Sequence, residues 1–143
     1  MLNSIVGTDI NNSELSDYLY FLMLQAVRSY QSHYQPKQLA TGLRTVEARI
    51  LLSLKTEQPL TQQILSQQVN MPDHDLQSAF AVLLEKGLIT RNNDSFNLLP
   101  AGDEMAATLW EIALDEQKQK FEKFSDEEVA TFKRILIDLI NQQ

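Results

Sequence analysis

The side chains in this sequence that could carry out catalysis or bind a metal do not form a recognisable set. The chain has no cysteine, which excludes disulfides, thiolate catalysis and thiol-based redox sensing. His33 and His74 are its two histidines, and neither has carboxylates at a metal-ligand spacing. No nucleophile elbow, phosphate loop or zinc-protease pattern is present. We therefore expect no enzyme, no metal site and no cofactor.

A second group of polar side chains is suited to binding double-stranded DNA. Gln77 can form a bidentate pair with adenine, and Ser78 and His74 can reach a base or a phosphate. Thr61, at an expected helix N-terminus, offers donors to a phosphate together with Gln62 and Gln63. The residues expected near the DNA backbone are Arg44, Lys86, Arg91, Asn92, Asn93 and Asn97. Each of these side chains also has a plain structural explanation as a cap, a turn residue or a solvated group.

An aromatic and polar group consists of Tyr30, His33, Tyr34 and Trp110. One interpretation is a pocket for a small aromatic ligand, and the other is aromatic packing in a dimer core around a satisfied histidine. The acidic run at residues 126–128 is more simply a helix start, stabilised by the helix dipole, than a metal site.

Charge argues against a strongly basic DNA-binding surface. The formal net charge is -7, which repels phosphates at long range unless cations gather on one face. Residues 44–102 hold five basic and six acidic side chains, and ten acidic residues face five basic ones after Gly102. The middle of the chain is therefore close to neutral.

Apolar spacing predicts a mainly helical chain with one small hairpin. A helix over about 13–34 precedes a linker at 35–43, which Pro36 is expected to open and Gly42 to close. Thr45 is the expected N-cap of the next helix, Thr61 caps a short one, and Pro72 suits the first position of the helix after it. Further helices are expected from Ala101 to about Phe124 and after the capping box that begins at Ser125.

The middle of the chain has the pattern of a helix-turn-helix. Leu76, Ala79, Phe80 and Leu83 fall at i, i+3, i+4 and i+7, which predicts one buried stripe on the second helix, and Gly87 supplies the left-handed stop. Two short strand-like runs, 88–91 and 96–99, then flank the turn residues 92–95.

The first helix carries an unusually apolar stretch. Residues 18–24 read YLYFLML, whereas a surface helix of a small domain keeps one polar face. A second partner surface is therefore implied, although burial inside one compact monomer is the alternative. No stretch approaches the roughly 20 apolar residues that span a bilayer, and we expect a soluble, cytoplasmic protein without a membrane partner.

The order of these elements and several local strings resemble the MarR family of bacterial transcriptional regulators. The matching strings are Gly42-Leu43, Leu60-Thr61, Leu83-x-x-x-Gly87-Leu88-Ile89-x-Arg91, Leu98-x-Pro100-x-Gly102 and Phe124-Ser125-x-Glu127-Glu128. The resemblance implies a winged helix-turn-helix fold over residues 43–102 within a single domain of 1–143. It also implies a homodimer formed by dimerisation helices in residues 1–40 and 103–143.

The sequence departs from the family where DNA would be read. In the family the second helix of the pair enters the major groove and a wing arginine reaches the minor groove. Here the outward positions of that helix carry Gln77, Ser78, Ala81, Val82 and Leu84 without a lysine or arginine, and the wing turn 92–95 is short. The expected function is a dimeric DNA-binding transcriptional regulator, responsive to a small aromatic ligand. The alternative is a winged-helix dimer that has lost DNA recognition and binds a protein through Ala81, Val82 and Leu84.

Overall fold

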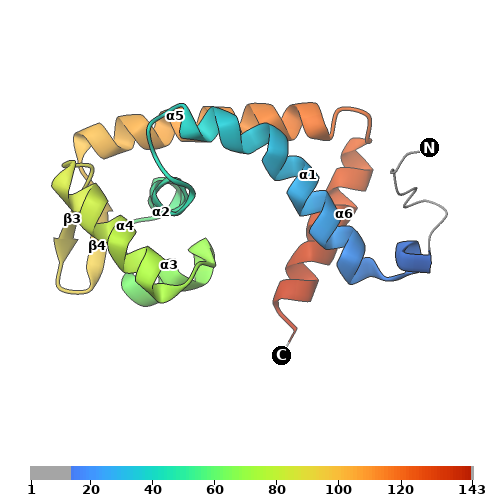
Figure 1. Ribbon diagram of the computed structural model, residues 1–143, viewed down its shortest axis with the longest axis horizontal. Coiled ribbons are helices and arrows are strands. Elements are labelled where there is room, and N and C mark those ends of the chain that lie inside the picture. The colour runs from blue at the N-terminus through green and yellow to red at the C-terminus, as the bar shows by residue number, and fades with distance from the viewer. Residues whose placement is uncertain (1–13, 143) are drawn as a thin grey trace. The chain divides into compact units, whose positions relative to one another are not determined.

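The computed structural model describes residues 14–142 (Figure 1), and the chain divides into two compact units, Met1–Pro36 and Lys37–Gln143. The expected fold class, mainly helical with a small β-hairpin, is confirmed. The elements in chain order are η2 (Glu14–Asp17), α1 (Leu19–Leu39), α2 (Thr45–Thr56), β2 (Leu60–Thr61), α3 (Gln62–Val69), α4 (Asp73–Glu85), β3 (Ile89–Asn92), β4 (Ser95–Leu98), α5 (Pro100–Lys120) and α6 (Asp126–Ile140).

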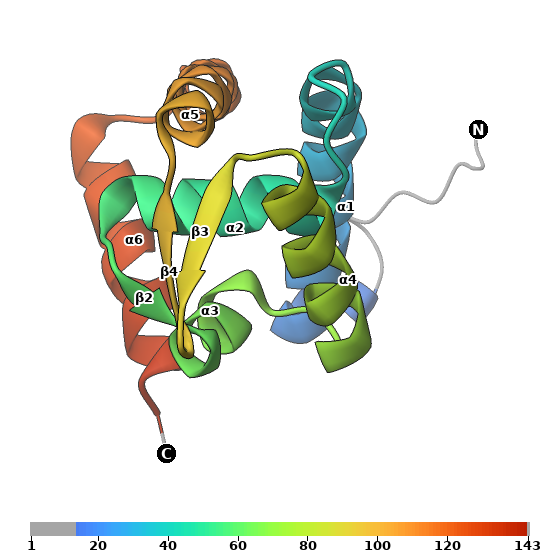
Figure 2. The same ribbon diagram turned by 90° about the vertical axis from the view of Figure 1, so that its left-hand side faces the viewer.

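The core of the second unit is built around α2. This helix packs against α3, α4 and α5, and Figure 2 shows it running behind the strands. Ile50, Leu51 and Leu54 of α2 are fully buried. The four-residue stripe predicted on α4 is also buried, with no member more than 2% exposed. At roughly 1.5–3 kcal/mol for each large apolar side chain removed from water, this burial holds the helix-turn-helix in place.

The sheet contains one strand more than the predicted hairpin. Its order is β2-β4-β3, with antiparallel pairing of Leu60 to Phe96 and of Arg91 to Phe96 on the two sides of β4. β2 is only two residues long, too short for a period-two pattern to reveal it. Asn93 occupies the left-handed region (φ 60°) in the turn between β3 and β4, a conformation that asparagine tolerates better than most residues.

Helix ends follow the predicted caps with two exceptions. The hydroxyl of Thr61 accepts a hydrogen bond from the Ile64 N–H, and Ser125 forms the predicted capping box with Glu128. Thr45 was expected to be an N-cap but is the first helical residue, because Arg44 occupies the N-cap position. Pro72 likewise lies one residue before α4, as its N-cap.

The predicted linker at residues 35–43 is wrong over its first half. Pro36 lies inside α1, which continues to Leu39. A proline inside a helix removes one hydrogen bond and crowds the carbonyl group four residues earlier, but the turn that follows Pro36 is held by side chains. The Gln38 amide donates to the Leu43 carbonyl at 2.7 Å, and Lys37 Nζ donates to Glu116 Oε1 at 2.8 Å. Gly42, at φ 87°, makes the turn that follows.

The start of α5 presses against the chain that enters the wing. A Cβ atom added at Gly102 would overlap the Leu88 carbonyl group, and the Leu99 N–H donates to the same carbonyl oxygen at 2.9 Å. Only glycine allows so close an approach of two backbone segments. Gly102 therefore fixes the end of the sheet to the beginning of α5.

Two helical segments leave their apolar side chains uncovered. No side chain of α6 is buried, and Phe132, Ile135 and Ile137 are 43–45% exposed. In the first unit Leu19, Leu24 and Val27 of α1 are 49–69% exposed. Within residues 14–142, no helix has the length and apolar content needed to cross a membrane.

Candidate nucleic-acid interface

The outward face of α4 carries polar and small side chains. Gln77, Ser78 and Ala81 are exposed, opposite the buried stripe. At the start of the helix His74 Nε2 lies 3.2 Å from Asp75 Oδ1, and the His74 side chain is 84% exposed. Amide, hydroxyl and imidazole groups can hydrogen-bond to base edges or phosphates. The structure thus brings Gln77, Ser78 and His74 together on one accessible helix.

The first helix of the pair is tied to the wing at its N-terminus. The Gln62 N–H donates to the Asp94 carbonyl at 2.9 Å, and Thr61 Oγ1 accepts from the Ile64 N–H at 3.2 Å. Two backbone N–H groups of the first turn are therefore already engaged, which leaves fewer of them for a phosphate. The Thr61 hydroxyl is the N-cap of α3, which is the plain structural role given above as the alternative to a phosphate contact.

The Arg91 side chain on β3 is held in place by contacts with Asn93 and Phe96. Its Nε donates to the Asn93 carbonyl at 2.8 Å, and its guanidinium carbon lies 5.3 Å from the ring centroid of Phe96. The Phe96 ring in turn stacks on Phe80 of α4 with centroids 4.2 Å apart. An arginine uses only one of its five donors in the Nε bond. Arg91 can therefore offer its terminal N–H groups from a fixed position, beside Asn92 at the end of β3 and Asn93 in the turn.

Arg44 has a partner that the sequence-based assignment overlooked. Its Nε donates to Glu47 Oε2 at 2.7 Å, while its backbone N–H donates to Glu47 Oε1 at 3.2 Å. Glu47 is only 2% exposed, and a buried carboxylate needs a nearby cation. Glu47 thereby balances the charge of Arg44, although the Arg44 side chain itself is 64% exposed. The i, i+3 spacing of the two residues was the available signal.

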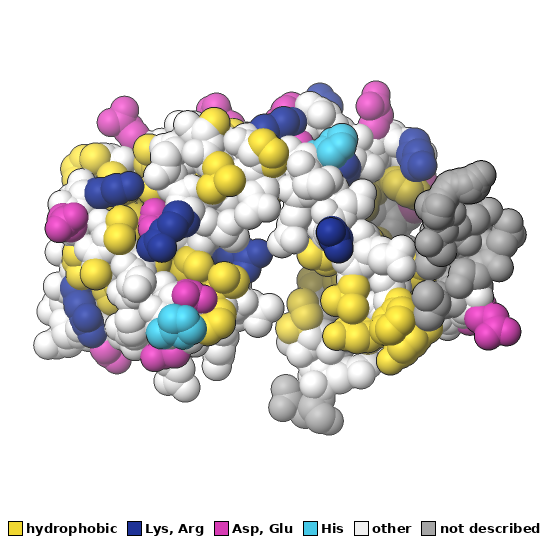
Figure 3. Space-filling model, viewed as in Figure 1, with side chains coloured by type: hydrophobic (Ala, Val, Ile, Leu, Met, Phe, Trp, Pro, Cys, Tyr) yellow, Lys and Arg dark blue, Asp and Glu magenta, His cyan; other side chains and the backbone are white. Residues whose placement is uncertain are grey.

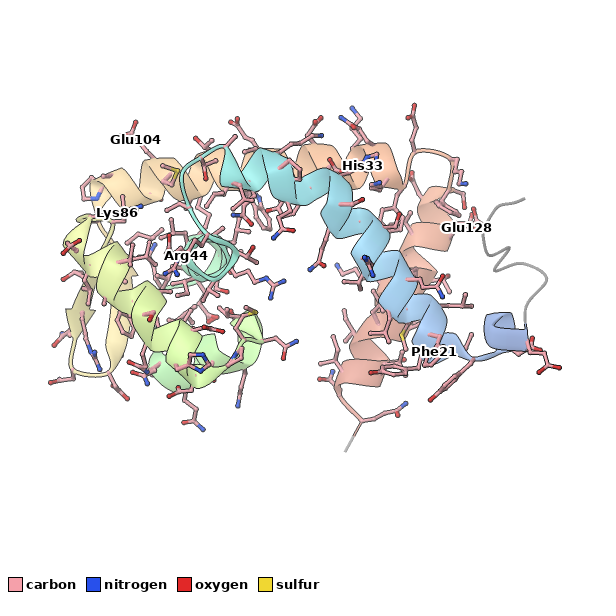
Figure 4. The ribbon with its side chains drawn as sticks, viewed as in Figure 1. Phe21, His33, Arg44, Lys86, Glu104 and Glu128 are labelled. Atoms are coloured by element: carbon pink, nitrogen blue, oxygen red, sulfur yellow. The ribbon has the colours of Figure 1, made fainter. Side chains whose placement is uncertain are left out.

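Lys86 is an accessible cation among the predicted DNA contacts. It is exposed at the C-cap of α4 (Figure 4), and no ion pair involves it within the described part of the chain. Lys55, in contrast, lies 3.3 Å from Asp103. Twelve residues of helix separate Lys86 from His74, a distance of about 18 Å. The predicted contacts therefore occupy both ends of α4.

The surface formed by α3, α4 and the strands has mixed charge. Figure 3 shows basic and acidic side chains interspersed on the face turned to the viewer, without a continuous basic band. Asp73 and Asp75 both lie in the first turn of α4. Electrostatic attraction to DNA at this surface thus depends on few cations.

The aromatic residues of the predicted ligand pocket belong to different units. Tyr30 and Tyr34, with ring centroids 6.5 Å apart, lie on α1 together with the exposed His33 (Figure 4). Trp110, 38% exposed, lies on α5 in the second unit. A shared pocket of these four residues stays a prediction.

A separate hollow of about 660 Å³ lies where the chain turns from α5 into α6. Its apolar lining consists of Phe121, Phe124, Val129, Phe132 and Ile135. Its polar lining consists of Ser125, Glu127, Glu128 and Thr131.

Comparison with solved structures shows the same architecture along nearly the whole chain, although no family model matches the sequence. A MarR-family transcriptional regulator from Silicibacter pomeroyi has 22% identity and a TM-score of 0.82, covering 93% of this chain and 94% of its own. CouR from Rhodococcus jostii RHA1, bound to p-coumaroyl-CoA, has 17% identity and a TM-score of 0.82, covering 92% and 98%. NadR in complex with 4-hydroxyphenylacetate has 18% identity and a TM-score of 0.78, covering 87% and 94%.

These similarities agree with the order of elements, the helix-turn-helix of α3 and α4 and the small sheet that follows it. TM-scores of 0.78–0.82 over 87–93% of this chain demonstrate a common fold, although the sequence identity is only 17–22%. The chain therefore has the winged helix-turn-helix fold of the MarR-family transcriptional regulators.

Proposed function

We propose that this protein is a cytoplasmic, non-enzymatic transcriptional regulator that binds double-stranded DNA as a homodimer. The observation that carries the proposal is α4, which buries one stripe and presents Gln77 and Ser78 on the opposite face. This helix belongs to a helix-turn-helix followed by a wing, within the fold of a family of DNA-binding regulators. In such a motif the second helix enters the major groove and the wing contacts the neighbouring backbone.

Dimerisation is supported by apolar surface that is exposed within residues 14–142. α6 buries none of its side chains, and the hollow beside it has an apolar lining. A helix with one apolar face gains stability by packing that face against a partner, and a second copy is the simplest partner. We assign residues 1–40 and 103–143 to dimerisation and residues 43–102 to DNA binding.

The dimer is tested by the mass in solution. We expect a species near twice 16.4 kDa by light scattering, and we expect Leu136→Asp to dissociate it, because a carboxylate buried in an apolar interface costs several kcal/mol. Lys133→Asp, on an exposed position of the same helix, is the matched control. A wild-type protein that is monomeric at micromolar concentration contradicts the proposal.

In the dimer, each α4 would read one half of a pseudo-palindromic operator. Gln77 would pair with adenine, and Ser78 or His74 would contact a base or a phosphate. Lys86 and Arg91 would contact the backbone on either side, and Thr61, Gln62, Asn92 and Asn93 would add uncharged contacts. Arg44 would contribute little while Glu47 holds it.

A small aromatic effector is the second part of the proposal. Structures with this fold include NadR in complex with 4-hydroxyphenylacetate and CouR bound to p-coumaroyl-CoA. Tyr30, His33, Tyr34 and Trp110 are the side chains we assign to such a ligand here. Because the chain has one tryptophan, an aromatic carboxylate that binds near Trp110 should quench its fluorescence.

The alternative function is a winged-helix dimer that binds a protein instead of DNA. The scarcity of accessible cations favours it. However, the apolar surface assigned to that partner is smaller than expected, because Leu84 packs against the core and Val82 is half-buried. Ala81 is the one exposed member of the three.

Binding to the promoter region of the protein's own gene separates the two functions. We expect specific binding that Gln77→Ala weakens on the operator more than on random DNA, because base contacts carry sequence discrimination and phosphate contacts do not. Gln67→Ala, on the exposed face of α3, serves as a control. Absence of binding even at low salt would favour the alternative.

A further inference from the structure

A second hollow in the Lys37–Gln143 unit lies between α2 and the end of α3. It measures about 430 Å³ and is lined by Arg49, Leu52, Ser53, Gln68, Val69 and Asn70. The three α2 residues follow the i, i+3, i+4 spacing of one helix face. Asn70 turns the chain out of α3 in the left-handed conformation (φ 55°). None of these residues belongs to the predicted DNA contacts or to the aromatic group.

Among the residues that the structure describes, Arg49 is the only charged side chain that lines this hollow. Its Nη1 donates to the Val69 carbonyl at 3.1 Å, which caps the C-terminus of α3 where carbonyl groups lack helical partners. No ion pair involves Arg49 among residues 14–142. The bond to Val69 uses one of the five guanidinium donors. The remaining donors are suited to an anion.

The rest of the lining restricts the kind of anion. Ser53, Gln68 and Asn70 supply neutral hydrogen-bonding groups, and Leu52 and Val69 supply apolar surface. One guanidinium matches one carboxylate in charge and in bidentate geometry, whereas a doubly charged phosphate would find only one cation. The volume lies within the range of small-molecule sites.

We propose that this hollow binds a small organic carboxylate, with its carboxylate group on Arg49 and its apolar part on Leu52 and Val69. Ligand binding at this site should also affect DNA binding by α4. This part of the proposal rests on the proposed DNA-binding function. Arg49 holds the carbonyl of Val69, and α4 begins four residues later at Asp73. A ligand that draws the guanidinium towards itself changes the support of the turn between the two helices, and DNA changes ligand affinity by the same factor.

Benzoate is a suitable probe, and benzamide is its neutral counterpart. We expect benzoate to shift the NMR signals of the Gln68 and Asn70 side-chain amides in full-length protein, with saturation at about 10 mM or below, and we expect benzamide to leave them unchanged. Lack of any shift with benzoate over that range, or equal shifts with both compounds, overturns the proposal.

Two glutamines on α3 provide a matched pair of variants that keep Arg49 and its bond to Val69. Gln68→Glu places a second carboxylate in the hollow and should weaken benzoate binding about fivefold or more. Gln67→Glu adds the same charge at an exposed neighbour outside the lining and should change affinity by less than about twofold. If both variants change benzoate affinity equally, the proposal that benzoate binds in this hollow is refuted.

Measurements of operator affinity with and without benzoate test the coupling between ligand binding and DNA binding separately. Benzoate should alter the operator affinity of wild-type protein more than that of Gln68→Glu, because the aromatic residues assigned to an effector are the same in both proteins; equal effects would refute coupling through this hollow. If wild-type protein binds benzoate with the expected variant pattern but never binds DNA, the carboxylate site stands and the DNA-binding function fails. If DNA binds and the operator affinity ignores benzoate, the coupling is refuted.

Discussion

The pairing of Arg44 with Glu47 makes a quantitative prediction about DNA binding. Neutralising Z phosphates gives a log-log salt slope of about -0.9Z. If a dimer uses only Lys86 and Arg91 of each protomer, Z is four, the slope is about -3.6, and affinity falls about 150-fold between 50 and 200 mM salt. If Arg44 also contributed, Z would be six, the slope about -5.4 and the loss about 1,800-fold.

Three variants identify which cations contribute to this slope in a fluorescence anisotropy assay with operator DNA. Lys86→Gln should reduce the slope by about 1.8, because it removes two phosphate contacts per dimer. Arg44→Gln should leave the slope unchanged while lowering the Tm, because Glu47, only 2% exposed, loses its cation. Glu47→Gln should release Arg44 and steepen the slope towards about -5.4.

The reasoning fails if Arg44→Gln flattens the slope as much as Lys86→Gln does. That result would mean that Arg44 leaves Glu47 to bind a phosphate, so that the 2.7 Å contact belongs to the free protein only. An unchanged slope in Glu47→Gln would also contradict the argument.

Further predictions concern stability and effector binding. Gly102→Ala should lower the free energy of unfolding by about 3 kcal/mol or more, because its Cβ overlaps a backbone carbonyl, whereas exposed Ala101→Ser should change it by less than about 0.5 kcal/mol; chemical denaturation that finds equal effects would contradict this packing. The hydrogen bond to Glu116 raises the pKa of Lys37 above 10.5, so the pair stabilises the fold below that pH and the contribution is lost as pH rises through the raised value. Lys37→Gln should therefore lower the Tm at neutral pH, and the Tm values of variant and wild type should converge at strongly alkaline pH. A ligand found in a panel of aromatic carboxylates should quench the fluorescence of Trp110 and raise the Tm. If no compound changes either signal, Tyr30, His33, Tyr34 and Trp110 are better explained as packing residues.

The helix-turn-helix was predictable because its signals are local and agree with one another. The spacing of Leu76, Ala79, Phe80 and Leu83 predicts the buried stripe of α4, and all four are buried. Gly87, at φ 73°, ends the turn after that helix as expected. Each of these features depends on neighbours within one or two helical turns, which the sequence displays directly.

The features that were missed depend on side-chain contacts or on distant segments. Pro36 predicts a helix break locally, yet the helix continues because Gln38 and Lys37 have partners beyond it. The stack of Arg91, Phe96 and Phe80 joins a strand to a helix and has no pattern in the linear sequence. The candidate contacts on α4 were accessible to sequence reasoning, whereas the engagement of Arg44 required the positions of its side-chain atoms.

The contact between Gly102 and the carbonyl of Leu88 has a mechanical consequence. It joins the wing to one end of α5, which has 21 residues and is therefore about 31 Å long. If α5 tilts by about 5° about its fixed N-terminal end, its C-terminal end moves by nearly 3 Å, because the helix is about 31 Å long. Small rotations at the wing are thus converted into ångström-scale displacements near α6.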